Sequence, residues 1–288
     1  MVAINNKETF ARYQKEFPHY QEFIGLIQGV YKLREKNEKA LKKDIFSINP
    51  ETATQKLKEG KPLLNLQNDH FADQLPKSYF LDLLSITEKN HPEMVRELRD
   101  LIAAKEDAYT ELVRELFSQN EKDVAAEAEN EPATPATPKN PDEFFDLVPF
   151  FLYESLKPFF SRLAQEQHEV IKNSHWDKGI CPVCSRPADL SLLRDDEGKR
   201  SLFCLQCDFE WPYKRLQCPF CENEDQDKLA YFTIDNKDQE KYRVSVCHQC
   251  QRFIKTIDLR KIGSKINLEI ENLITLHLDL QADKEGFK

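Results

Sequence analysis

Four C-x-x-C pairs constrain the fold of this chain more than any other feature. All eight cysteines lie in these pairs, within one stretch that runs from Cys181 to Cys250. The pairs are Cys181/Cys184, Cys204/Cys207, Cys218/Cys221 and Cys247/Cys250. A C-x-x-C turn aims two sulfurs at one point, and a β-hairpin between two such turns brings four sulfurs together. The pattern therefore predicts two four-thiolate metal sites of the zinc-ribbon or rubredoxin-like kind.

Three combinations of the pairs are possible, and the spacing favours the sequential one. Spacers of 19, 10 and 25 residues separate successive pairs. The longer spacers suit hairpins, whereas the 10-residue spacer suits a link between two modules, so we expect the first pair to join the second and the third to join the fourth. Closed four-thiolate sites accept zinc or iron, which leaves the metal open. They also lack a free coordination position, which disfavours catalysis by the metal.

Two details near the cysteines affect these sites. The residues that follow the second cysteine of each pair are not glycines, although such turns favour a permissive residue there; they are Ser185, Asp208, Glu222 and Gln251. We expect somewhat loosened turns as a result. His175 and His248 lie near cysteines, but each site already has four thiols, so neither histidine is needed as a ligand.

The rest of the chain favours an α+β fold in which an N-terminal helical bundle precedes the two modules. Apolar residues recur at helical spacing from Tyr20 to Tyr31 and in a long stripe from Pro92 to Phe117. A phenylalanine-rich helix follows, and Pro158 is expected to kink or break it. The predicted divisions are 1–118 (helical domain), 119–142 (acidic Pro/Ala-rich linker or insertion), 143–175 (helix packing on the bundle), 176–216 and 217–262 (four-cysteine modules), and 263–288 (C-terminal helix).

Composition disfavours several classes of function. The chain carries 41 basic and 50 acidic side chains, and the stretch from 176 to 262 carries 15 of each, so the modules lack the positive field of a nucleic-acid binder. No signal peptide and no apolar run of membrane-spanning length are present, which predicts a cytoplasmic protein without membrane insertion. The cytoplasm keeps thiols reduced, and this favours metal ligation over disulfides. No nucleotide-binding or hydrolase motif occurs.

At this point the motifs resemble those of the FdhE family, the accessory proteins of formate dehydrogenase maturation. The resemblance is strongest over residues 180–287. It rests on an ordered set of residues: Cys181-Pro182-Val183-Cys184 with Pro187, then Arg200, Leu202, Cys204, Cys207, Trp211, Arg215, Cys218 and Cys221, then Leu229-Ala230-Tyr231, and last Cys247 and Cys250 with Phe253, Lys255 and Asp258. The missing glycine after Cys184 and the long acidic segment depart from the family pattern.

The resemblance implies a helical domain followed by two rubredoxin-like modules. It also implies a non-enzymatic cytoplasmic protein that binds iron at its cysteines. Its partners would be the catalytic subunit of respiratory formate dehydrogenase and the twin-arginine signal peptide of that subunit. Trp211 and Arg215, between the two modules in the sequence, are candidate partner contacts, although packing between the modules is the simpler explanation.

Two other functions remain open from the residues alone. A zinc-ribbon protein that binds nucleic acid would show salt-dependent binding, which the balanced charge disfavours. A thiol oxidoreductase would need a lowered thiol pKa and usually a βαβ setting, neither of which the sequence indicates.

Overall fold

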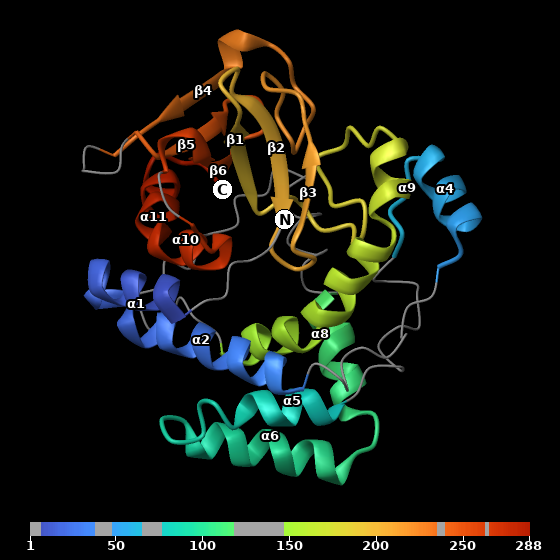
Figure 1. Cartoon of the computed structure of the whole chain (residues 1–288), viewed down its shortest axis with the longest axis vertical. Helices are drawn as coiled ribbons and strands as arrows, with labels where there is room; N and C mark the ends of the chain where they lie inside the picture. Colours follow the sequence, from blue (N-terminus) through green and yellow to red (C-terminus); the bar gives the residue numbers. More distant parts are fainter. Residues whose placement is uncertain (1–6, 38–47, 65–76, 118–146, 235–239, 263–264) are drawn as a thin grey trace. The chain divides into compact units, whose positions relative to one another are not determined.

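The computed structural model describes residues 7–37, 48–64, 77–117, 147–234, 240–262 and 265–288 (Figure 1). The predicted acidic segment 119–142 lies outside these residues. Contacts divide the chain into two compact units, each assembled from separate stretches of sequence. Unit 1 comprises Met1–Gln28, Ile48–Leu63 and Phe160–Lys288, and unit 2 comprises Gly29–Ser47 and Leu64–Phe159. The predicted domain boundaries stay predictions.

Unit 2 is helical. Its helices are the second half of α2 (Gln21–Lys36), α5 (Lys77–Leu84), α6 (Pro92–Ala104), the helical residues 108–117 and the first part of α8 (Leu147–Glu166). The rings of Phe80 and Tyr109 pack 5.3 Å apart, and the Tyr109 hydroxyl bonds the Ser155 hydroxyl at 2.8 Å. The stripe expected from Pro92 to Phe117 is interrupted because Lys105 adopts an extended conformation and ends α6.

The predicted break at Pro158 is absent, since α8 continues through it to Glu166, and the alternative of a kink stays a prediction. A proline inside a helix removes one backbone hydrogen bond and crowds the preceding turn. The side chains on either side, Leu156 and Phe160, are fully buried. Their packing offsets the lost bond and keeps the segment helical.

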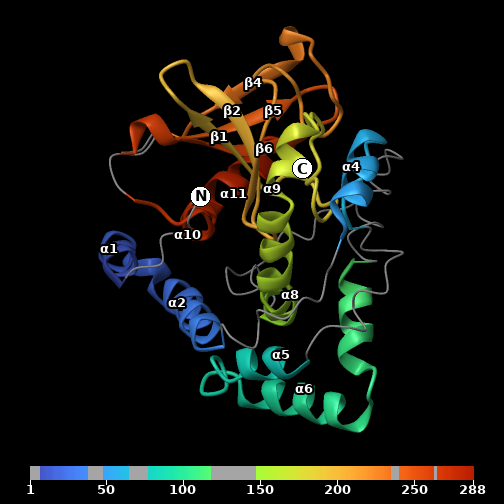
Figure 2. The same ribbon diagram turned by 45° about the vertical axis from the view of Figure 1, so that its right-hand side comes forward.

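Unit 1 is built around one six-stranded sheet (Figures 1 and 2). The strands are β1 (Leu190–Arg194), β2 (Lys199–Cys204), β3 (Phe209–Pro212), β4 (Leu229–Phe232), β5 (Tyr242–Cys247) and β6 (Arg252–Asp258), in the order β3-β2-β1-β6-β5-β4. The shortest strands are β3 and β4, with four residues each. The β1–β2 turn places Asp195 and Gly198 at positive φ, and Gly198 N–H donates to the Asp195 carbonyl.

The two cysteine modules share this sheet rather than standing apart. Strands β1 to β3 belong to the first module and β4 to β6 to the second, and each set pairs antiparallel internally. The parallel pairing of β1 with β6 joins the sets, with Ser191 opposite Thr256 and Leu193 opposite Asp258. One continuous hydrogen-bonded layer therefore carries both groups of cysteines.

Two helices at the C-terminus pack on the sheet, one against β5 and the other beside β1, β2 and β6 (Figures 1 and 2). They are α10 (Leu268–Ile274) and α11 (Leu276–Lys284), so the single helix expected for 263–288 is divided at Thr275. Asn267 caps α10 by accepting bonds from two backbone N–H groups. The Lys255 ammonium on β6 is buried against the Asp279 carboxylate of α11 at 2.6 Å, which fixes helix and sheet together.

The remaining helices of unit 1 include α1 (Lys7–Glu16), α4 (Pro50–Lys58) and α9 (His168–Asn173). Helix α1 reaches α10 through a buried network in which Tyr13 and Tyr242 both donate hydroxyl bonds to the Glu271 carboxylate. Burial raises the pKa of Glu271 despite these two donors. A helix from one end of the chain is therefore held to the sheet and to a helix from the other end.

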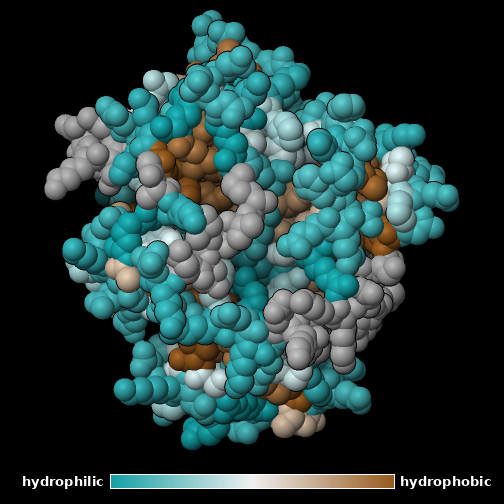
Figure 3. All heavy atoms as spheres, in the orientation of Figure 1, coloured by the Kyte–Doolittle hydropathy of each residue, from teal (hydrophilic) through white to brown (hydrophobic). Residues whose placement is uncertain are grey.

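Most of the face seen in Figure 3 is hydrophilic, with apolar side chains gathered in a few patches. Among the described residues, no helix combines the length and apolar character needed to cross a bilayer.

Candidate metal centres

The first centre gathers Cys181, Cys184, Cys204 and Cys207, all with 0–1% exposure. Cys204 is the last residue of β2, and Cys207 lies in the turn that leads to β3. Cys181 and Cys184 lie in the turn closed by the Ile180–Pro187 bridge. The Sγ atoms of Cys184 and Cys204 are 3.6 Å apart, and all four sulfurs lie within 4.8 Å of one another.

The second centre gathers Cys218, Cys221, Cys247 and Cys250, again within 4.8 Å. The Sγ atoms of Cys218 and Cys250 are 3.7 Å apart, as are those of Cys221 and Cys247. Cys221 and Cys250 are only partly buried, so this centre lies nearer to solvent than the first. The pairing in both centres is the sequential one that the spacing predicts.

Both groups have the dimensions of a tetrahedral thiolate site. Metal–sulfur bonds of about 2.3 Å place the sulfurs of a tetrahedron about 3.8 Å apart, close to the measured 3.6 and 3.7 Å. Backbone and side-chain N–H groups also point at the sulfurs: Val183 N–H at Cys181 and the Asn223 amide at Cys247. Such donors stabilise negative charge on thiolates. The two groups can hold metal ions, and the geometry fits zinc and iron alike.

Three thiols of the second centre, those of Cys218, Cys221 and Cys250, have pKa values shifted in opposite directions. A hydrogen bond from the Cys250 thiol lowers the pKa of Cys218 to about 5, and the same interaction raises the pKa of Cys250. Burial raises the pKa of Cys221 to about 11. A metal ion that binds these four sulfurs displaces the protons that the thiols retain.

All four turns use the left-handed conformation that glycine would favour. The residues after the second cysteines have φ of 64° (Ser185), 50° (Asp208), 58° (Glu222) and 55° (Gln251). Backbone bonds close the turns, such as Ser185 N–H to the Cys181 carbonyl at 3.1 Å and Glu222 N–H to the Cys218 carbonyl at 3.0 Å. The expected loosening is absent from this geometry, because non-glycine residues adopt the same conformation at a cost in strain.

Replacing Glu222 with glycine should raise the free energy of unfolding of the metal-loaded protein by about 0.5–1 kcal/mol, because glycine adopts positive φ without a Cβ clash. Denaturant unfolding measures the change. Glu224→Gly is the matched control. Glu224 is also exposed and lies two residues after Glu222, but its φ is not positive, so glycine there should lower the free energy of unfolding. Equal effects at the two positions would contradict the strain argument.

A close backbone approach ties the two centres together. A Cβ on Gly179, just before the first C-x-x-C turn, would lie 1.7 Å from the carbonyl oxygen of Pro219 in the third. The Trp211 indole donates to the Lys178 carbonyl at 2.9 Å, and the Tyr213 hydroxyl donates to the Cys218 carbonyl at 3.0 Å. Sequence reasoning did not single out Gly179 or Tyr213, since neither lies in a recognisable ligand pattern.

The other residues singled out from the sequence have these positions. Trp211 on β3 is buried and its indole donates to the Lys178 carbonyl, whereas Arg215 is exposed. Partner binding by these two residues stays a prediction. His248 stacks edge-on against Phe287 at 5.3 Å and His175 is exposed. Among the described residues, both groups of candidate ligands consist of cysteines alone.

Comparison with known proteins shows which proteins this chain is similar to. No protein-family model matches the chain. The FdhE homologue of Aquifex aeolicus is 26% identical over 95% of this chain and 88% of its own length. The resemblance to the FdhE family is confirmed. Escherichia coli FdhE is 30% identical over 140 residues, which are 48% of this chain and 44% of that protein.

The crystal structure of the FdhE protein from Pseudomonas aeruginosa has the same fold. It matches with a TM-score of 0.71 over 100% of this chain and 93% of that one, at 19% identity. The mixed architecture of helices and sheet, with two four-cysteine groups toward the C-terminus, is therefore the predicted one.

Proposed function

We propose that this chain is a non-enzymatic accessory factor for the maturation of respiratory formate dehydrogenase. The observation that carries the proposal is the similarity to FdhE proteins over nearly the whole chain, together with eight cysteines arranged as two closed centres. Closed four-thiolate centres suit folding and binding roles better than catalysis, because no coordination position is left for a substrate.

All eight cysteines serve as metal ligands in this proposal, four to each ion, and the ion is iron or zinc. The first centre acts as a structural staple, since its sulfurs are shielded from solvent. The second centre, with Cys221 and Cys250 partly exposed, is the one at which a metal or a redox state can change. This difference in exposure gives the two centres separate roles.

The proposed client is the catalytic subunit of formate dehydrogenase, which the protein binds in the cytoplasm before export. The client's twin-arginine signal peptide is a second proposed contact. A net charge of −9 is compatible with a basic peptide. Arg215 is the exposed member of the two candidate contact residues.

Deleting the gene should abolish respiratory formate dehydrogenase activity while the client transcript persists. The wild-type gene supplied in trans should restore activity, and a gene carrying Cys204→Ser should not. Unchanged activity in the deletion strain would contradict the proposal. Restoration by Cys204→Ser would instead refute the need for the first metal centre.

A further inference from the structure

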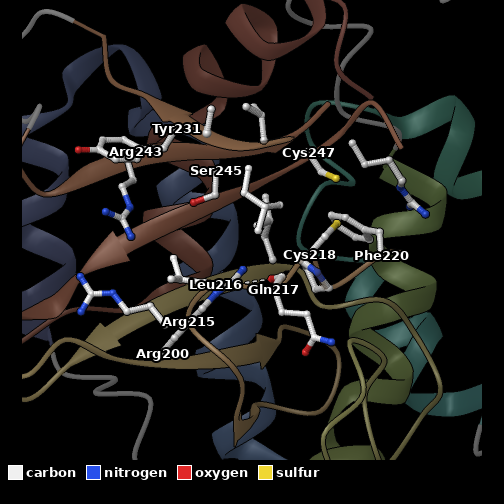
Figure 4. A pocket seen from close by; sticks show the side chains of 16 residues that line it. Arg200, Arg215, Leu216, Gln217, Cys218, Phe220, Tyr231, Arg243, Ser245 and Cys247 are labelled. Carbon is white, nitrogen blue, oxygen red and sulfur yellow. Dashed lines mark hydrogen bonds between the residues drawn. The ribbon is translucent and has the colours of Figure 1, made fainter. Parts of the chain in front are cut away.

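A pocket of about 110 Å³ adjoins the second metal centre (Figure 4). Cys218 and Cys247 form part of its wall, and strands β4, β5 and β6 form much of the rest. Drug-sized ligands need pockets of several hundred Å³, so this volume suits a group of only a few atoms.

The charged residues that line this pocket are all arginines: Arg200, Arg215, Arg243 and Arg252. Arg200 is held by neutral acceptors, the Ser191 hydroxyl at 2.8 Å and the Gln217 carbonyl at 2.7 Å. Burial lowers the pKa of Arg200 to about 10. Among the described residues, no carboxylate forms an ion pair with Arg200, Arg215 or Arg243. The pocket therefore concentrates positive charge within the stretch 176–262, which has no net charge.

Within the described part of the chain, Arg243 and Arg215 have guanidinium N–H groups without a hydrogen-bond acceptor. The Nε of Arg243 is buried without a hydrogen-bond partner in the described structure, and its guanidinium stacks on the Tyr231 ring at 4.7 Å. The nearby carboxylate of Asp258 is engaged by Arg260 through two bonds of 2.6 and 2.7 Å. Arg215 donates one bond, to the Glu197 carbonyl at 2.9 Å.

The negative charge of a thiolate centre would account for arginines close to the sulfurs, but not for arginines at the far end of the pocket. Figure 4 shows the guanidinium groups of Arg243 and Arg215 at the end of the pocket opposite the sulfurs of Cys218 and Cys247, with Arg200 between them. Two like charges that approach one another away from the centre raise the free energy unless an anion neutralises them. Guanidinium groups bind carboxylates and phosphates through paired N–H bonds.

The rim of the pocket indicates what carries the anion. Tyr231 is 61% exposed and Leu216 is 54% exposed, and both line the opening. Exposed apolar and aromatic residues beside an arginine are typical of surfaces that bind polypeptides. We propose that this pocket binds the C-terminal carboxylate of a polypeptide, with Arg243 and Arg215 on the carboxylate and Tyr231 and Leu216 against the last apolar side chain.

The site does not depend on which client the protein serves, so its failure would leave the proposed function standing. Because the pocket is cationic, it repels arginine-rich peptides, and a twin-arginine signal would bind elsewhere. The proposal therefore adds a second, acid-specific contact to the molecule.

Isothermal titration of the metal-loaded full chain at constant ionic strength tests the proposal. The probes are a pentapeptide that ends in leucine with a free carboxylate, the same peptide with an amidated end, sodium acetate and inorganic phosphate. The free-acid peptide should bind at least tenfold more tightly than the amide and than acetate. Equal affinity for acid and amide would overturn the proposal, and tighter binding of phosphate than of the free acid would assign the pocket to a free ion instead.

Variants locate the binding. Arg243→Gln and Arg215→Gln should each weaken the binding of the free-acid peptide at least tenfold. The second variant keeps the test valid if the first perturbs the sheet. Arg96→Gln, which removes the same charge from an exposed position on α6, should leave affinity unchanged. If all three variants bind the free-acid peptide as tightly as the wild type does, the peptide binds outside this pocket and the assignment is refuted.

Discussion

Replacing Cys204 with serine should remove one metal ion and unfold the first half of the sheet. Cys204 ends β2 and is fully buried among the other three thiols of its centre. Metal binding at such sites supplies on the order of 10 kcal/mol, comparable to the entire stability of a domain. Hydrogen exchange of the amides in β1 to β3, measured with metal content, should show both losses together.

The matched substitution at the second centre should be milder. Cys250 is partly exposed, so Cys250→Ser should also remove one metal ion but leave β1 to β3 protected from exchange. Ser185→Ala, next to a ligand but outside the sulfur set, should change neither quantity. Retention of both ions by Cys204→Ser would refute the assignment of the first centre, and equal unfolding by both cysteine variants would refute the difference between the centres.

Replacing Gly179 with alanine should destabilise the metal-loaded protein by about 3 kcal/mol or more. The added methyl group would lie 1.7 Å from the Pro219 carbonyl oxygen, so the backbone must move, and the two backbones adjoin different candidate metal centres. The displacement therefore strains both centres at once. Denaturant unfolding of the metal-loaded protein measures the loss.

Gly25→Ala provides the matched control for this clash. Gly25 lies in α2, and a Cβ there would meet nothing within 4 Å. Alanine favours helix over glycine by about 1 kcal/mol, so this variant should be more stable than the wild type. If Gly179→Ala has the same free energy of unfolding as the wild type, the two turns are not in the close contact described.

The cysteine centres could be predicted from the sequence because their geometry is local. A C-x-x-C turn positions two sulfurs whatever surrounds it, and a hairpin-length spacer selects the partner pair. The left-handed residues Glu222 and Gln251 follow from the same turn, yet their side chains gave no sign of it, since neither type favours positive φ.

The parts that were missed depend on contacts between distant residues. The parallel pairing of β1 with β6 joins strands more than 50 residues apart, and no local pattern specifies it. The C-terminal helix divides at Thr275, and α11 after it packs against Val244 and Val246 of the sheet. Pro158 does not end α8, because its neighbours are buried and their packing keeps the segment helical.

The distribution of charge also depends on contacts between distant residues and could not be predicted from the sequence. The equal numbers of acidic and basic residues from 176 to 262 suggested a surface without a strong field. Arg200, Arg215 and Arg243 come from different parts of that stretch, and the fused sheet brings them to one pocket beside the second centre. A net charge of zero therefore concealed a local concentration of positive charge.

Elemental analysis of the purified full-length protein, combined with an optical spectrum, tests the metal centres most directly. Two centres predict two metal ions per chain, with all eight cysteines protected from alkylation until the metal is removed. Iron bound by thiolates would absorb visible light, whereas zinc would leave the spectrum clear. A chain that folds fully without metal, or that carries disulfides between these cysteines, would contradict the assignment.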